Sequence, residues 1–425
     1  MSGIGDLDAL APEKSRLAAD LEELASFTDP DEAGWTRRVF SEPYRASRAW
    51  VRARMRDAGL AVREDDAGNL IGLLPGTTGA PALVTGSHTD TVSRGGRFDG
   101  VVGVLGAIEV ARRLRETGTR LAHDLLVVDF LGEEPNAHGV SCIGSRTIAG
   151  LLSSGYLDQL DGHGVPLGRA LESAGRSPSD MLRAAWRPGE IAAFVELHIE
   201  QGPVLQRRQT DIGVVTAIAG IERVMAAFTG RADHAGTMPM TDRRDALAAA
   251  AQAILAVEQI GCSQPDAVAT VGDLETAPGA LNVVPESARV WAELRSPSAA
   301  WLGTARRRVV QDIADLAQVR GVDVELDWLN DQDPVPTTVG VQDVIAAASQ
   351  SLGRRWTPIV SGAGHDAAHM AALAPMGMIF VPSRDGRSHC PEEWTDLDQI
   401  GAGVHALAAT VASLDGNPHV GALAT

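Results

Sequence analysis

The hydrophobic pattern of the chain predicts buried strands that end in polar residues. Apolar runs stand at 82–85, 125–131, 191–195 and 377–381, and short runs of this kind are typical of buried strands. A helical stripe follows the first run, with apolar residues at 104, 108, 111 and 114 and a stop signal at Gly118. Upstream, two helices at 14–27 and 43–58 and a hairpin of strands at 60–62 and 70–74 are predicted. Strands that alternate with helices predict an α/β fold with a mostly parallel sheet.

The middle of the chain has a different pattern, which predicts an inserted domain. Strands are predicted at 214–228, 267–274, 288–294 and 322–328, and helices at 242–259 and 299–318. The order β-α-β-β-α-β is ferredoxin-like and self-contained. We therefore expect a larger domain formed by residues 1–213 and 332–425, interrupted by a second domain at 214–331.

Residues with metal-binding side chains follow the predicted strands of the larger domain. His88 and Asp90 come after the first run and Asp99 follows a glycine-rich loop, while later runs lead into Glu133-Glu134, His198 and His389. The ends of parallel strands meet at one edge of a sheet, so these side chains should converge. Imidazoles and carboxylates suit Zn²⁺, Mn²⁺, Co²⁺ or Ni²⁺. Five ligands are enough for two ions if Asp99 bridges them: His88, Asp99, Glu134, His198 and His389.

Such a pair of ions could hold one hydroxide and polarise a carbonyl group, which is hydrolytic chemistry. Asp90 is placed to support the His88 imidazole from behind. Of the adjacent Glu133 and Glu134, one can bind metal while the other acts as general base, because neighbouring side chains leaving a strand point in different directions. The spacing alone does not decide between them.

The composition of the chain argues against some classes of binding partner and indicates a cellular compartment. The chain has 425 residues and a net charge of −18 without a basic stripe, which argues against nucleic acid or an anionic membrane surface as a partner. The start, residues 1–6, lacks the features of a secretory signal, and the apolar run 101–110 is too short to span a membrane. Three scattered cysteines fit a reducing compartment, so a cytoplasmic location is expected.

Several segments together resemble the amidase/carbamoylase branch of the M20 metallopeptidase family. They are G-S-H-T-D-T-V (86–92), G-G-R-F-D-G (95–100), E-L-H-I-E-Q-G-P-V-L (196–205), R-A-D-H-A-G-T-M-P-M (231–240), P-G-A-L-N-V-V-P (278–285), S-G-A-G-H-D-A (361–367) and V-P-S-R-D-G-R-S-H (381–389). His198 within its segment is typical of this branch, since peptidase relatives usually carry an acid there. The chain departs from the pattern at Pro135-Asn136-Ala137-His138 and at Cys390, both beside the predicted site.

The resemblance implies a role for each candidate residue. His88 and His198 would each bind one ion, Asp99 would bridge the ions, and Glu134 and His389 would complete the pair, with Glu133 as general base. The Asp99–Gly100 peptide would be cis. The inserted domain would be a lid and dimerisation domain, whose His234 reaches the site of the partner subunit to stabilise an oxyanion. Residues expected to contact substrate are Asn282 and Arg295, which would hold a carboxylate, and Gln201 and Gly364, which would line the pocket.

The resemblance further implies a small ureide or amide substrate that bears a carboxylate. The hypothesis we favour is that a homodimer holding two divalent ions hydrolyses an N-carbamoyl-L-amino acid to the amino acid, CO₂ and ammonia. Alternatives within the hydrolases are allantoate or another ureide, or an N-acyl amino acid. From another class, a catalytically silent binding protein is disfavoured because every expected ligand and the base are present.

Overall fold

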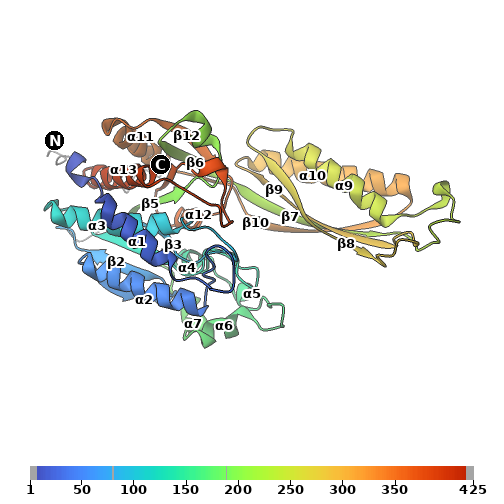
Figure 1. Ribbon diagram of the computed structural model, residues 1–425, viewed down its shortest axis with the longest axis horizontal. Helices are drawn as coiled ribbons and strands as arrows, with labels where there is room; N and C mark the ends of the chain where they lie inside the picture. Colours follow the sequence, from blue (N-terminus) through green and yellow to red (C-terminus); the bar gives the residue numbers. More distant parts are fainter. Residues whose placement is uncertain (1–6, 79–80, 188, 418–425) are drawn as a thin grey trace. The chain divides into compact units, whose positions relative to one another are not determined.

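The computed structural model describes residues 7–78, 81–187 and 189–417, and the chain divides into two compact units (Figure 1). Unit 1 comprises residues 1–216, 337–359 and 365–425, and unit 2 comprises 217–336 and 360–364. The boundaries expected from the sequence were 213/214 and 331/332. Unit 2 is thus an insertion in the chain of unit 1.

Unit 1 begins with helical elements that cover its core. Helix α2 starts where the Ser41 side chain accepts a hydrogen bond from Tyr44 N, with a proline in the first turn, as expected of a helix N-terminus. Helix α3 is buried along most of its length and packs against α1, α13 and β3. The helices of unit 1 are η1 (Leu7–Leu10), α1 (Lys14–Ala25), α2 (Glu42–Asp57), α3 (Val101–Glu116), α4 (Ile143–Ile148), α5 (Ser154–Leu157), α6 (Leu167–Ser173), α7 (Pro178–Met181), α8 (Val204–Arg208), α11 (Val339–Ser351), α12 (Asp366–Met370), η3 (Arg384–Gly386) and α13 (Leu397–Asp415).

The larger sheet, whose four central strands belong to unit 1, has a parallel centre and antiparallel flanks. Its strand order is β1-β2-β4-β3-β5-β13-β6-β11, with β12 paired to β6. The four central strands, β4, β3, β5 and β13, are parallel to one another, so their carboxyl ends lie at one edge. The strands are β1 (Ala61–Glu64), β2 (Leu70–Leu74), β3 (Ala82–His88), β4 (Leu125–Phe130), β5 (Ile191–Ile199), β6 (Ile212–Ile218), β11 (Val335–Pro336), β12 (Trp356–Ser361) and β13 (Met376–Val381). The α/β fold class is confirmed.

Unit 2 has the predicted β-α-β-β-α-β order. Its four strands form one antiparallel sheet in the order β10-β7-β9-β8, and the helices α9 and α10 pack on one face of it. The elements are β7 (Gly220–Thr229), η2 (Met240–Asp242), α9 (Ala246–Gly261), β8 (Val268–Ala277), β9 (Ser287–Ser296), α10 (Ala299–Arg320) and β10 (Asp323–Gln332).

One predicted element differs from the structure. The stretch 214–228, expected to be a single strand, is two strands that belong to different sheets. Strand β6 ends at Ile218 and pairs with β13, whereas β7 starts at Gly220 and pairs with β9. Continuous hydrophobicity fits both strands equally well, so the sequence pattern does not reveal the break between them.

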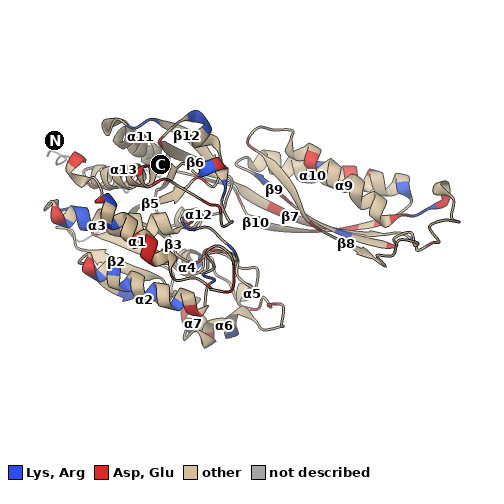
Figure 2. Ribbon diagram, in the orientation of Figure 1, with Lys and Arg blue, Asp and Glu red and all other residues tan. Residues whose placement is uncertain are grey.

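Charged residues are distributed along the helices of unit 1. Acidic and basic residues are interspersed along α1, α2 and α3 (Figure 2). Among the described residues, no helix combines the length and hydropathy needed to cross a bilayer. The three cysteines, Cys142, Cys262 and Cys390, are all free thiols.

Candidate metal centre

The predicted ligands of unit 1 converge at the carboxyl ends of its parallel strands. His88 ends β3, His198 lies near the end of β5, and Glu134 and His389 lie on the loops that follow β4 and β13. Asp99 immediately precedes α3. All of them except His389 are buried; the side chain of His389 is 47% exposed.

These side chains form two groups that share Asp99. In each group the ligand atoms lie within 4.8 Å of one another; the first is His88, Asp99 and His198, and the second is Asp99, Glu134 and His389. Asp99 Oδ1 is 3.1 Å from His198 Nε2, and Asp99 Oδ2 is 2.9 Å from His389 Nε2. The sequence interpretation assigned His88 and His198 to different ions. In the structure both histidines fall in the same group with Asp99, and they extend from the adjacent strands β3 and β5.

The histidine tautomers fit metal binding. The Nδ1 atom of His88 lies 3.1 Å from the main-chain oxygen of Asp90, and Nδ1 of His198 lies 2.9 Å from that of Ile199. Since a carbonyl oxygen only accepts, each Nδ1 carries a proton, and in the neutral form of each ring the lone pair is then on Nε2. His198 Nε2 also accepts a hydrogen bond from Gly100 N at 3.2 Å. Two electron-rich atoms, His198 Nε2 and Asp99 Oδ1, therefore face each other, an arrangement that a cation between them would stabilise.

The electrostatics of the cluster also favour a cation. Burial, followed by the charge of Asp99, raises the pKa of Glu134 to about 7. A hydrogen bond with Asp99 raises the pKa of His389 to about 9. Burial, with the nearby Glu134 and Asp366, holds the pKa of Glu133 well above its ordinary value. Burial disfavours the charged form of these carboxylates, and divalent ions bound here would compensate their negative charge.

Asp90 accepts hydrogen bonds from the main chain of both glutamates, whereas the sequence analysis expected it to support His88. Its Oδ1 accepts a hydrogen bond from Glu133 N at 3.2 Å and its Oδ2 one from Glu134 N at 3.1 Å. The expected contact with His88 Nδ1 is longer, at 3.6 Å from Oδ1. Asp90 therefore fixes the main chain from which both Glu133 and Glu134 extend.

The two glutamates diverge as expected from neighbouring positions on the chain. Glu134 Oε1 lies 3.3 Å from His389 Nε2, within the second ligand group. Glu133 belongs to neither group that contains Asp99; its Oε2 is 3.6 Å from His88 Nε2, and its Oε1 accepts a hydrogen bond from the Cys142 thiol at 3.5 Å. This division favours Glu134 as ligand and Glu133 as base.

A closed loop follows the glutamates. Three main-chain hydrogen bonds join its ends: Cys142 N to Glu133 O, Ile143 N to Gly132 O and Gly144 N to Leu131 O, at 2.8–3.0 Å. The unusual segment 135–138 lies in this loop, with Pro135 and Ala137 exposed.

The expected cis peptide at Asp99–Gly100 is wrong. Among the described residues the cis peptide is Ala277–Pro278. Gly100 turns the chain instead through a positive φ of 66°, and Val101 N donates to Asp99 O at 2.7 Å across this three-residue turn. A Cβ atom on Gly100 would lie 2.4 Å from His88 Nε2, so both the backbone conformation and the ligand require glycine here.

Gln201 lies beside the ligands. Its Nε2 donates to Asp99 Oδ2 at 3.0 Å and lies 3.3 Å from His389 Nε2. Both Gln201 and His389 have positive φ, 59° and 55°, a conformation uncommon outside glycine and often associated with functional sites. Gln201 was expected to line the substrate pocket, and its position next to Asp99 is compatible with that role.

Sequence reasoning missed several residues that hold the cluster together. Glu393 Oε1 accepts hydrogen bonds from Phe98 N at 2.7 Å and Asp99 N at 3.1 Å, and thereby fixes the turn that presents Asp99. His365 is buried with its ring 4.6 Å from that of His198. The segment S-G-A-G-H-D-A contained a signal for His365, whereas the Glu393 contact spans almost 300 positions and had none in the sequence.

The remaining candidates belong to unit 2. His234 and Asn282 are neighbours there, because Ala235 N donates to Asn282 O at 3.0 Å and residues 234 and 283 form a bridge. His234 is exposed, and its Nδ1 accepts a hydrogen bond from Gly236 N at 3.0 Å. Its proton must then reside on Nε2, which is a donor. Arg295 and Gly364 lie in the same unit, with Arg295 Nη1 bonded to Gly362 O at 3.0 Å.

An α/β sheet that gathers imidazoles and carboxylates at its strand ends, with an inserted ferredoxin-like unit, is the architecture of a two-domain metal-dependent hydrolase. Residues 84–413 match the model of Peptidase family M20/M25/M40, and the chain belongs to this family. It is 39% identical over 403 residues to an N-carbamoyl-L-amino-acid amidohydrolase of Paenarthrobacter aurescens, covering 94% of this chain and 98% of that protein.

Two further similarities define the branch. A ureidoglycolate hydrolase of Oryza sativa subsp. japonica is 36% identical over 97% of this chain and 87% of its own length. The crystal structure of an amidase of the hydantoinase/carbamoylase family from Burkholderia multivorans matches with a TM-score of 0.87 and 33% identity, over 95% of this chain and 98% of that one. The resemblance to the amidase/carbamoylase branch is confirmed.

Proposed function

We propose that this protein is a cytoplasmic amidohydrolase that cleaves the C–N bond of an N-carbamoyl-L-amino acid, yielding the amino acid, CO₂ and ammonia. The observation that carries the proposal is the pair of ligand groups sharing Asp99, with Glu133 beside them and belonging to neither. The 39% identical amidohydrolase supports the choice of substrate class.

Two divalent ions (Zn²⁺, Mn²⁺, Co²⁺ or Ni²⁺) would be held by His88, Asp99 and His198 on one side and Asp99, Glu134 and His389 on the other. Bound there, they supply Lewis acidity that activates a water molecule and polarises the carbonyl group. Glu133 takes the proton of the attacking water and returns it to the leaving nitrogen. Its raised pKa suits it to hold that proton between the two steps.

Residues of unit 2 bind the substrate in this proposal. Arg295 and Asn282 hold the carboxylate, since a guanidinium matches a carboxylate with two parallel hydrogen bonds. His234, reaching the site of a partner subunit in a homodimer formed through unit 2, donates from Nε2 to the oxyanion. Gln201 and the 362–364 segment line the pocket. Unit 2 then acts as a lid and dimerisation domain.

The 36% identical ureidoglycolate hydrolase favours a second candidate, hydrolysis of a ureide such as allantoate or ureidoglycolate. A panel of N-carbamoyl-L-amino acids, allantoate, ureidoglycolate, β-ureidopropionate and N-acyl amino acids, assayed for ammonia and amine release by the metal-loaded protein, separates these. Preference for an N-carbamoyl-L-amino acid supports the proposal; turnover confined to ureides replaces it by the second candidate. Failure to bind divalent metal in elemental analysis would contradict both.

A further inference from the structure

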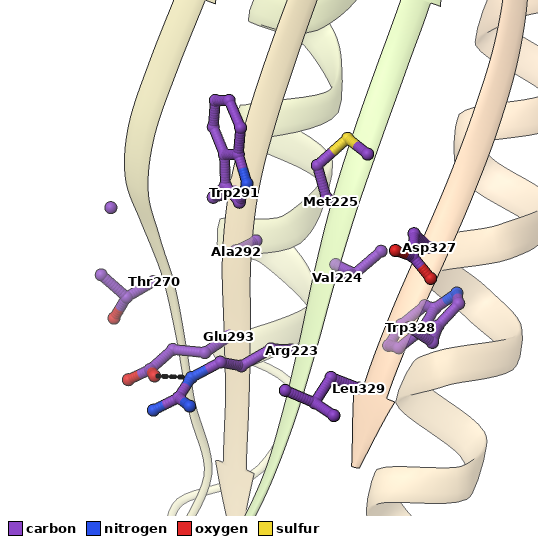
Figure 3. A pocket seen from close by; sticks show the side chains of 11 residues that line it. Arg223, Val224, Met225, Thr270, Trp291, Ala292, Glu293, Asp327, Trp328 and Leu329 are labelled. Carbon is purple, nitrogen blue, oxygen red and sulfur yellow. Dashed lines mark hydrogen bonds and ion pairs between the residues drawn. The ribbon is translucent and has the colours of Figure 1, made fainter. Parts of the chain in front are cut away.

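The open face of the unit 2 sheet carries the charged side chains of Glu293 and Arg223 beside Arg295. Along β9, residues 290, 292 and 294 are buried against α9 and α10, while 291, 293 and 295 face the opposite side. On that side a groove of about 400 Å³ crosses β8, β9, β7 and β10. Figure 3 shows Glu293 and Arg223 paired in this groove, with Trp291 and Met225 next along the two strands.

Glu293 binds two arginines at once. Its Oε1 accepts a hydrogen bond from Arg295 Nε at 2.7 Å, and its Oε2 one from Arg223 Nε at 3.5 Å. The side chains of Glu293 and Arg295 are about one-quarter exposed, at 27% and 26%. This partial burial sets the pair apart from fully solvated surface ion pairs, which order their partners little.

The Arg295 guanidinium is fixed at two of its three nitrogens. Nε is held by Glu293, and Nη1 donates to the main-chain oxygen of Gly362 at 3.0 Å. Within the described part of the chain, no hydrogen bond is made by Nη2. A carboxylate can bind a guanidinium through Nε and Nη2 or through Nη1 and Nη2. Glu293 occupies the first edge at Nε, which favours binding of a carboxylate at the second.

We propose that Glu293 is a positioning residue for recognition of the substrate carboxylate: it holds Arg295 at Nε and so presents the Nη1–Nη2 edge. The inference rests on the proposed function, in which Arg295 binds the carboxylate. The bond to Gly362 aligns the same guanidinium with the 361–364 segment, which is also expected to line the pocket.

Glu293 also has an effect that would weaken binding of the carboxylate. Its negative charge reduces the positive potential at Arg295, so its removal would strengthen the attraction for any anion. The bond to Nε is short and charge-assisted, and its loss frees a long side chain to adopt other rotamers. We expect this loss of orientation to outweigh the gain in charge, because the Glu293 side chain is about one-quarter exposed and solvent screens its effect on the potential.

The test compares Glu293→Ala, Glu293→Gln and Arg295→Lys in the metal-loaded full-length protein. Glu275→Ala is the matched control, since Glu275 faces Arg289 across the same sheet at 4.0 Å but is well exposed. Each variant is assayed with the best substrate from the panel and with the α-carboxamide analogue of that substrate, and thermal unfolding checks folding.

We expect Glu293→Ala to raise KM for the carboxylate substrate about tenfold, with kcat changed less than about twofold. Glu293→Gln keeps a neutral acceptor for Nε and should restore KM to within about threefold of the unchanged protein. The carboxamide analogue should be insensitive to both. In the Arg295→Lys background, Glu293→Ala should add nothing further.

The results distinguish carboxylate binding by Arg295 from the positioning role of Glu293. If Arg295→Lys leaves KM unchanged, carboxylate binding by Arg295 is wrong, and with it that part of the proposed function. If Arg295→Lys raises KM but Glu293→Ala lowers it, or if the Ala and Gln variants behave alike, Glu293 acts only through its charge and the positioning role is overturned. If Glu293→Ala fails to fold, the Gln variant assayed with both substrates still tests the positioning role. A tenfold rise in KM for the carboxylate substrate in Glu293→Gln would contradict that role.

Discussion

Replacing Asp90 tests whether one carboxylate positions both Glu133 and Glu134. Asp90 is fully buried, and its two oxygens accept hydrogen bonds from Glu133 N and Glu134 N. A buried N–H without an acceptor costs about 1–3 kcal/mol, so Asp90→Ala should lose about 2–6 kcal/mol of stability. Asp90→Asn retains one acceptor oxygen and should lose about 1–3 kcal/mol.

Replacing Asp90 should also lower turnover and metal affinity, beyond its effect on the free energy of unfolding. A shift of the Glu133–Glu134 main chain moves both the proposed ligand and the proposed base, and displacements near 1 Å cost about 100-fold in rate. We expect Asp90→Asn to lower kcat by about that factor and metal affinity by about 10–100-fold. The assay is turnover per folded molecule, together with metal titration and thermal unfolding.

Asp129→Asn is the control for losing a buried carboxylate nearby. Asp129 binds Arg48 and the Thr89 hydroxyl but none of the ligands. This variant should lose stability and keep its turnover per folded molecule. The reasoning is refuted if Asp90→Asn retains normal turnover and metal affinity, or if its effects only match those of Asp129→Asn.

Three further predictions concern the same centre. Glu133→Gln should nearly abolish turnover while metal content, measured by elemental analysis, stays at two ions; unchanged turnover would remove Glu133 from its role. Gly100→Ala should weaken metal binding because its Cβ meets His88 Nε2, whereas Gly118→Ala, with a similar φ of 71° and open space around it, should show only the backbone cost of about 1–2 kcal/mol. Finally, the pKa values of Glu134 and His389, raised to about 7 and about 9, lie above those of the unfolded chain, so the metal-free protein loses this stabilisation as the pH rises through them. Cations compete with those protons, so the increase in Tm on adding a divalent ion should grow between about pH 6 and about pH 9; an increase that stays constant or shrinks contradicts this.

Local patterns predicted the central strands and the candidate ligands, because each candidate lies at the end of an apolar run or on the loop that follows it. The ligand His88 and the turn at Asp99 could be located in this way, and so could the four strands of unit 2. The arrangement of ligands around Asp99 depends on which strands are adjacent in the sheet, and this neighbour relation is not encoded in spacing. The role of Asp90 likewise depends on β3 lying beside β4.

Other features depend on contacts between distant positions or on single backbone angles. Glu393 meets Asp99 across the whole fold, so neither segment reveals the other. The break between β6 and β7 occurs at Ala219, inside a continuous apolar stretch that satisfies two sheets. The expected cis peptide was wrong because a glycine with positive φ achieves the turn with the ordinary trans bond.

The loop between Glu133 and Cys142 separates residues with fixed positions from residues free to vary. Its base is tied by main-chain hydrogen bonds, and its glutamates are anchored through Asp90. Substitutions at the exposed Pro135 and Ala137 can therefore accumulate without displacing Glu133 and Glu134, whereas the Asn136 side chain accepts hydrogen bonds from His138 N and Val140 N and helps to hold the loop. Evolution, or an experiment that aims to change selectivity, can therefore alter exposed positions of this segment at little cost.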